Sequence, residues 1–95
     1  MPYYALFYDT VDNFAERKQP YRQAHLGCVD EAYRAGRLVL AGALQPAGAL
    51  IVFRTDTVKE VEEFAKTDPY VANGLVSNWR VHEWSVVVGE HAVPR

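Results

Sequence analysis

The sequence predicts an α+β protein, a four-stranded antiparallel sheet with two helices, and three observations predict this class. The chain has 95 residues, of which 49% are hydrophobic and 13% aromatic, a composition typical of one small domain spanning residues 1–95. Two segments have helical periodicity, and four have the short apolar runs of strands. These segments follow one another in the order β-α-β-β-α-β.

The first strand is predicted over residues 3–9, because both of its alternating faces are apolar. Such a strand belongs inside a sheet that is covered on both faces. Residues 11–19 form a charged connection that has room for a short helical turn. The main helix then runs from Pro20, which suits a first helical turn, to Gly36, a residue type that often ends a helix.

The main helix is amphipathic when its residues are placed at about 100° intervals. His25 lies within the apolar side of this helix. A titratable ring on the core side of a helix is unusual, which makes His25 the first candidate for chemistry. The other residues predicted on that side are Tyr21, Leu26, Cys28, Val29, Ala32 and Tyr33.

Residues 37–45 and 49–54 predict two strands, joined by a turn at 46–48 into a hairpin. Gly42 lies inside the first of these strands. A glycine there predicts a β-bulge or a close approach of another backbone.

The second helix begins after Thr57, which has the capping-box spacing to Glu60. Asp68 ends this helix, because a residue before proline is disfavoured in the helical conformation. Asp68 can also cap a further turn that begins at Pro69. A final strand is predicted over residues 76–88, and residues 90–95 are expected to be a frayed tail.

The order of elements predicts a ferredoxin-like sandwich, in which right-handed crossovers place both helices on one face of the sheet. No segment of the chain remains to cover the other face, although the first strand is apolar on both sides. We therefore expect a homodimer in which the sheets of two copies pack face to face.

The composition argues against several classes of partner. The net charge is −2 and the basic residues are scattered, so the basic patch of a nucleic-acid-binding protein is missing. The first residues do not have the pattern of a signal peptide, and no apolar run approaches the length of a membrane span. The single cysteine, Cys28, excludes an internal disulfide framework. We expect a cytoplasmic protein without a nucleic-acid or membrane partner.

His25 suits general acid/base catalysis, because imidazole exchanges protons near neutral pH. A buried histidine with a purely structural role is the commoner case. Asp68 is the best candidate partner, since capping a helix uses only part of the accepting capacity of a carboxylate. Asp9, at the end of the first strand, is the alternative partner, and sequence spacing does not choose between them.

Three further residues are candidates for the wall of a pocket. Arg22 lies three residues before His25 and is its neighbour on the helix, where it can bind an anionic substrate or extend into solvent. Tyr70 and Tyr8 can line the pocket or simply pack in the core.

Other combinations carry little chemical information. His25 and Cys28 are three residues apart, but a single pair of this kind is not a zinc signature, and free cysteine is usually a small buried hydrophobe. His82 and His91 have no visible partner. The chain contains no glycine-rich phosphate loop, so we expect no nucleotide cofactor. Because it has no metal-ligand signature, we expect no metal either.

Three segments together resemble the YciI-like (YCII-related) family over about residues 3–88: Arg22-Gln-Ala-His25-Leu, Gly36-Arg-Leu-Val-Leu-Ala-Gly42 and Asp68-Pro69-Tyr70. The resemblance implies a ferredoxin-like fold that dimerises through its sheets as a dimeric α/β barrel. It also implies that His25 and Asp68 face one pocket as an acid/base pair. One branch of the family removes chloride from a chlorinated hydroxyquinol, although the connection at residues 45–48 is shorter here than in some members.

We therefore expect a small cofactor-free enzyme of lyase or hydrolase type, acting on a small aromatic or anionic metabolite. His25 would move the proton, and Asp68 would fix the tautomer of His25 or act as the second acid/base. Arg22 would hold substrate charge, with Tyr70 as a pocket wall. The alternative is a non-catalytic small-ligand-binding or assembly module with the same pocket. Analogy with other dimeric α/β barrels adds oxygenation and isomerisation as further reaction classes.

Overall fold

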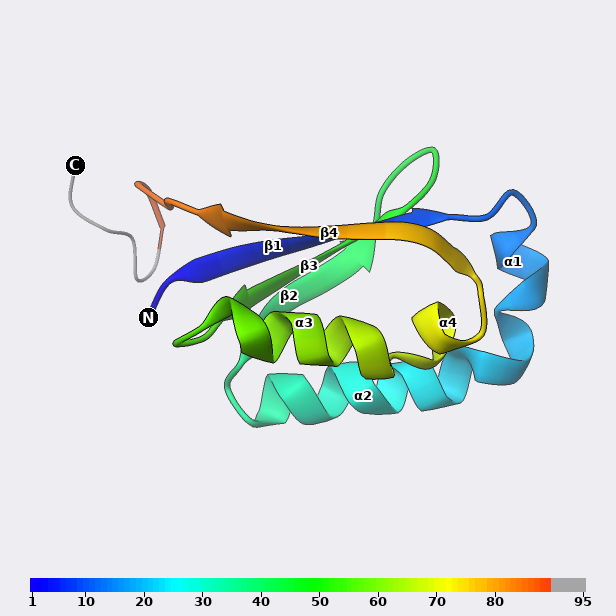
Figure 1. Cartoon of the computed structure of the whole chain (residues 1–95), viewed down its shortest axis with the longest axis horizontal. Coiled ribbons are helices and arrows are strands. Elements are labelled where there is room, and N and C mark those ends of the chain that lie inside the picture. Colours follow the sequence, from blue (N-terminus) through cyan, green and yellow to red (C-terminus); the bar gives the residue numbers. More distant parts are fainter. Residues whose placement is uncertain (90–95) are drawn as a thin grey trace.

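The structure is a computed structural model in which residues 1–89 are described, and its elements follow the predicted order (Figure 1). The strands are β1 (Tyr3–Thr10), β2 (Leu38–Ala43), β3 (Ala49–Arg54) and β4 (Val76–Trp84). The helices are α1 (Phe14–Arg17), α2 (Arg22–Arg34), α3 (Val58–Thr67) and α4 (Pro69–Ala72), with a 3₁₀ turn at Gln19–Tyr21. The tail that was predicted to fray, residues 90–95, lies outside the described residues, as does His91.

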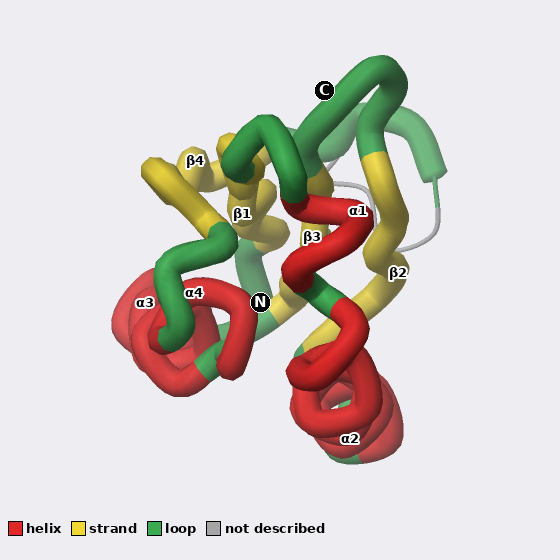
Figure 2. Tube along the Cα trace, turned by 90° about the vertical axis from the view of Figure 1, so that its right-hand side faces the viewer, coloured by secondary structure: helices red, strands yellow, loops and turns green. Residues whose placement is uncertain are grey.

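The four strands form one antiparallel sheet in the order β2-β3-β1-β4. Figures 1 and 2 show α2 and α3 on the same face of this sheet. The predicted ferredoxin-like fold is therefore confirmed. β1 is central, and its neighbours β3 and β4 pair with it over most of its length.

The hydrophobic core lies between the sheet and the helices. Alternate residues of β1 point into it, and the three other strands, α2, α3, α4 and the segment before β4 supply the other side chains. Its most deeply buried members are Leu6, Tyr8, Ala32, Phe53, Val61, Ala65 and Leu75. Tyr8 is the one of these that carries a polar group, and that hydroxyl belongs to the candidate site.

Both predicted helix boundaries have the expected capping interactions. Gly36 has φ +80° after α2, and the N–H groups of Gly36 and Arg37 donate to the carbonyls of Tyr33 and Ala32 at 3.0 Å, which is a Schellman motif. At the start of α3, a carboxylate oxygen of Glu60 accepts from the N–H of Thr57 at 3.3 Å.

Three details predicted from the sequence are wrong: the end of the last strand, the start of the main helix and the irregularity at Gly42. The last strand ends at Trp84 rather than at residue 88, because Trp84 pairs with Tyr3 at the start of β1 and the ladder has no partner beyond it. Pro20 lies in the 3₁₀ turn, and α2 begins only at Arg22. Gly42 pairs regularly with Leu50, and the irregularity in β2 falls between Leu38 and Leu40.

The apolar side predicted for α2 is also too wide. The side chain of Tyr33 is 61% exposed, and that of Leu26 is exposed as well. The sheet covers a narrower stripe of the helix, in which Ala32 is buried and His25, Cys28 and Val29 are partly buried.

The sheet face away from the helices carries apolar side chains. Phe7 and Leu50 pair with each other on this face and are partly buried, whereas Leu40 is 59% exposed and Trp84 is exposed. The described part of the chain covers this face with no helix (Figure 2). No helix among the described residues has the length and apolar composition needed to cross a membrane.

Candidate active site

His25 and Asp68 lie in hydrogen-bond contact, although 43 residues separate them in the chain. The Nδ1 atom of His25 is 2.8 Å from one carboxylate oxygen of Asp68 and 3.0 Å from the other. α2 holds His25, and the junction between α3 and α4 holds Asp68. The hydrogen bond between His25 and Asp68 therefore links α2 to the junction of α3 and α4.

Asp68 accepts two further hydrogen bonds. The hydroxyl of Tyr8 donates to its Oδ2 at 2.7 Å, and the backbone N–H of Tyr70 donates to its Oδ1 at 3.0 Å. The second bond is the predicted cap of α4, so capping and contact with His25 occur on the same carboxylate.

These contacts define the tautomer of His25. Asp68 is completely buried, and a buried carboxylate is tolerated when hydrogen-bond donors surround it. A carboxylate only accepts, so Nδ1 carries the hydrogen and donates it. In neutral His25 the lone pair is then on Nε2, which has no partner among the described residues.

Aromatic packing fixes the plane of the imidazole. The ring of Tyr70 stacks on that of His25, with centroids 3.9 Å apart and an interplanar angle of 13°. The ring of Phe14 packs edge-on against the ring of Tyr70, with the two ring centroids 5.1 Å apart. The buried Asp68 and the Tyr70 ring together leave the imidazole little freedom to rotate.

His25 lines a cavity of about 330 Å³ between α2 and the β2–β3 side of the sheet. The volume lies within the ~300–1,000 Å³ range of small-molecule sites. Two cationic side chains, Lys18 and Arg22, also line it, and among the described residues neither has an ion-pair partner. Its apolar wall is formed by Phe14, Leu26, Val29, Ala41, Ala49 and Ile51.

Burial perturbs the phenols and the thiol around Asp68. The pKa of Tyr8 is raised well above its usual range, first by burial and then by the negative charge of Asp68 and the hydrogen bond to it. Burial also raises the pKa of Tyr70, which the charge of Arg22 partly offsets. The pKa of the Cys28 thiol is raised by burial and by the charge of Asp68, so this group is a poor nucleophile at neutral pH.

The other predicted candidates lie elsewhere. Asp9, the alternative partner for His25, instead lies 3.5 Å from the guanidinium of Arg80 on the exposed surface. Cys28 lines a different cavity from His25. His82 is exposed on β4, with its ring edge-on to Phe7. The described residues contain no group of three His, Cys, Asp or Glu side chains placed to hold a metal ion.

Sequence reasoning missed three residues at this cavity. Phe14 and Lys18 lie in the segment predicted only as a connection, and Lys18, Arg22 and His25 have the spacing of successive helical turns. Gly48 also lines the cavity; its φ is +93°, and a Cβ on it would be 2.7 Å from the backbone oxygen of Tyr8. Only the fold could reveal that approach, because Tyr8 lies on β1 and Gly48 lies in the loop between β2 and β3.

Comparison with known proteins gives a family and a fold. The YCII-related domain family matches residues 1–85. A comparison with curated proteins found no match. One similar solved structure is that of 5-chloro-2-hydroxyhydroquinone dehydrochlorinase (TftG) from Burkholderia phenoliruptrix AC1100, in complex with 2,5-dihydroxybenzoquinone. Its TM-score is 0.78 at 16% sequence identity, and the match covers 96% of this chain and 99% of that chain.

A second solved structure is a candidate antibiotic biosynthesis monooxygenase from Deinococcus radiodurans, with a TM-score of 0.57 at 17% identity and coverage of 100% and 99% of the two chains. A third, a protein from Agrobacterium tumefaciens, has a TM-score of 0.55 at 10% identity, with 97% of each chain covered. At such low identities these likenesses show the fold alone.

Proposed function

The chain belongs to the YCII-related family, and we propose that it is a cofactor-free enzyme that uses His25 and Asp68 as a general acid/base pair. Its substrate is a small aromatic or anionic metabolite, and the reaction is of lyase or hydrolase type. The observation that carries the proposal is the triple hydrogen bonding of the buried Asp68, which leaves Nε2 of His25 free beside a cavity.

In this proposal, Nε2 of neutral His25 takes a proton from an acidic group of the substrate. The imidazolium that forms is stabilised by Asp68, which lies 2.8 Å from Nδ1. The same Nε2 then returns the proton to the product or the leaving group, so that the enzyme ends in its starting state. Tyr8 and the N–H of Tyr70 continue to donate their hydrogen bonds to Asp68 and hold it in place.

The lining of the cavity supports the substrate class. Tyr70, already stacked on His25, adds an aromatic wall, and Arg22 supplies a positive charge at the same cavity. The dehydrochlorinase with the same fold binds 2,5-dihydroxybenzoquinone, a planar oxygenated ring. We infer a ring of similar size and polarity for this chain.

The proposal includes the homodimer. The uncovered sheet face carries Phe7, Leu40, Leu50 and Trp84, and pairing two such faces would remove these apolar side chains from water. The cavity of His25 lies on the opposite, helical side of the sheet, so each copy would keep its own site.

A panel of chlorinated and unchlorinated hydroxyhydroquinones, with chloride release and proton release as readouts, tests the proposal. We expect turnover by the wild type and a loss of about 10²-fold or more in kcat/KM for His25→Gln and for Asp68→Asn. Asp56→Asn, which changes an exposed carboxylate in the loop between β3 and α3, serves as the matched control.

Full turnover by His25→Gln would contradict the proposal. Binding of 2,5-dihydroxybenzoquinone to wild type and to His25→Gln alike, without turnover of any panel member, would favour the non-catalytic binding module instead.

A further inference from the structure

The hydroxyl of Tyr8 does more in the candidate site than line a pocket. Tyr8 borders the cavity of His25, yet it is only 2% exposed, and its hydroxyl donates to Oδ2 of Asp68 at 2.7 Å. A phenol has a single hydrogen to donate, so this bond uses all of its donor capacity. A ligand in the cavity therefore receives no hydrogen bond from Tyr8, and the group on which the hydroxyl acts is Asp68.

The carboxylate of Asp68 is shared among three donors. Nδ1 of His25 lies 2.8 Å from Oδ1 and 3.0 Å from Oδ2, so it shares one oxygen with the backbone N–H of Tyr70 and the other with the hydroxyl of Tyr8. Each donor stabilises the negative charge of a carboxylate and so weakens its attraction for a further hydrogen. The Tyr8 hydroxyl therefore acts directly on the hydrogen bond between Asp68 and His25.

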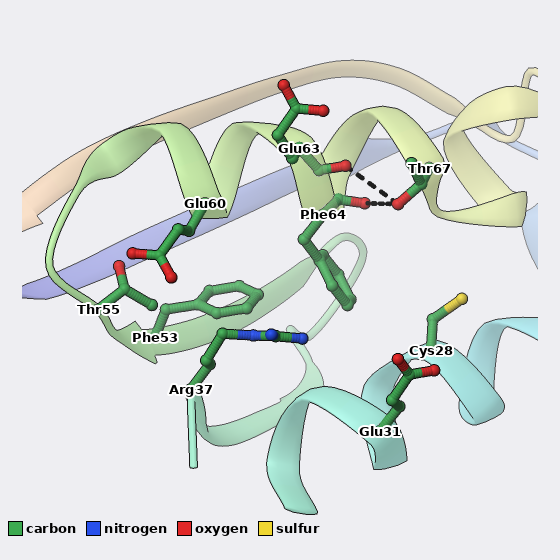
Figure 3. Close-up of a pocket in the computed structure, with 9 residues that line it drawn as sticks. All are labelled: Cys28, Glu31, Arg37, Phe53, Thr55, Glu60, Glu63, Phe64 and Thr67. Atoms are coloured by element: carbon green, nitrogen blue, oxygen red, sulfur yellow. Dashed lines mark hydrogen bonds between the residues drawn. The ribbon is translucent and has the colours of Figure 1, made fainter. Parts of the chain in front are cut away.

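The phenols and the thiol around this network titrate well above neutral pH. The pKa of Tyr8 is raised far above its usual range, first by burial and then by the charge of Asp68, so its hydroxyl keeps the donated hydrogen. Burial is also the main cause that raises the pKa of Tyr70 on α4 and of the Cys28 thiol on α2. Figure 3 shows Cys28 on the wall of a separate cavity between α2 and α3, with Glu31 close by on the same helix. Two cationic side chains line the His25 cavity itself, Lys18 and Arg22.

From this geometry we propose that Tyr8 is a positioning residue for the acid/base pair: its hydroxyl holds Oδ2 of Asp68 and moderates the hydrogen bond that Asp68 accepts from His25. The inference rests on the proposed function, in which Nε2 of His25 moves the proton. A stronger pull by Asp68 on the Nδ1 hydrogen makes Nε2 more basic. A larger share of His25 is then protonated at neutral pH and cannot accept a proton from the substrate.

Two variants that change this one donor in opposite directions test the proposal. Tyr8→Phe removes the hydroxyl, whereas 3-fluorotyrosine at position 8 keeps it and strengthens it as a donor, because fluorine makes the phenol more acidic. The readout is the nitrogen-15 NMR signals of the His25 ring in the full chain at about pH 9, above the usual titration range of imidazole. His25→Gln assigns these signals. Tyr4→Phe, which removes the hydroxyl of another buried tyrosine of β1, is the matched control.

The expected result is an order of signals. The Nδ1 signal should move downfield in Tyr8→Phe, because Asp68 then pulls the Nδ1 hydrogen more strongly, and upfield in the fluorinated variant. Wild type and Tyr4→Phe should coincide between these two. The fluorinated variant keeps both the ring and the hydroxyl, so it decides the question even where Tyr8→Phe does not fold. An Nδ1 signal that is the same in wild type and in the fluorinated variant, or that moves in the reverse order, would overturn the proposal.

A kinetic measurement separates this inference from the proposed function. With a substrate from the hydroxyhydroquinone panel, the acidic limb of the pH profile of kcat/KM should move to higher pH in Tyr8→Phe and to lower pH in the fluorinated variant. A purely structural role of Tyr8 would lower kcat/KM at every pH without moving the limb, and this result would also overturn the inference. The NMR measurement needs no substrate, and the turnover of His25→Gln tests the function, so either can fail without the other.

Discussion

Replacing Tyr8 with phenylalanine removes one oxygen atom from the network around Asp68 and tests whether that network stabilises the fold. The Tyr8 hydroxyl donates to a carboxylate at 2.7 Å, and both groups are buried, so water can replace neither partner. A hydrogen bond to a charged group contributes ~1.5–3 kcal/mol. Asp68 keeps its donors from His25 and Tyr70 in the variant. We therefore expect Tyr8→Phe to lower the free energy of unfolding by ~2 kcal/mol and Tm by about 10 °C.

The same phenol makes the expected loss depend on pH. The pKa of Tyr8 is raised in the folded protein, mainly by burial. Above its ordinary pKa of about 10, the unfolded chain releases this proton while the folded protein keeps it. The stabilisation by Tyr8 is thus fully present below about pH 10 and declines as the pH rises, by up to ~1.4 kcal/mol per pH unit. Tyr8→Phe lacks this decline, although Tyr70, whose pKa is also raised, still contributes one.

Urea unfolding, followed by tryptophan fluorescence from about pH 8 to about pH 11, measures both effects. The difference in stability between wild type and Tyr8→Phe should be greatest near pH 8 and should shrink above about pH 10. Tyr33→Phe is the control, because that side chain is 61% exposed and should change stability little. A variant as stable as wild type at pH 8, or a difference that stays constant up to pH 11, would refute the reasoning.

Two further predictions address Gly48, which lines the cavity, and the uncovered sheet face. Gly48→Ala should destabilise the protein by ~1–3 kcal/mol in thermal melting, because φ at this position is +93° and the new Cβ would meet the backbone oxygen of Tyr8. Gly27→Ala in α2 should instead stabilise the protein by ~0.5–1 kcal/mol, because nothing lies within 4 Å of the new Cβ. Equal effects at the two glycines would contradict this account. Leu40→Arg should convert a dimer to a monomer in sedimentation at micromolar concentration, whereas Val58→Arg, on the helical side, should not. A wild-type monomer would contradict the dimer itself.

Local interactions explain why so much of the fold was predictable. The alternation in β1, the capping box at Thr57 and the Asp68-Pro69 boundary each depend on a few neighbouring residues, and each appears as expected. The errors occur where a partner strand or a packing surface decides. β4 ends at Trp84 because Trp84 lies opposite Tyr3, where β1 begins. Tyr33 is exposed because the sheet covers only part of α2.

The sequence by itself determined the order of the elements, the helix boundaries at Gly36, Thr57 and Asp68, and the choice of His25 and Asp68 as candidates, because periodicity, capping and residue chemistry are local properties. The tertiary structure decided between Asp68 and Asp9, since a hydrogen bond across 43 residues is a consequence of how α2 packs beside α3. It also placed the Tyr8 hydroxyl on Asp68 and formed the cavity that His25 lines. Distances between elements arise from packing, which no short segment of the chain encodes.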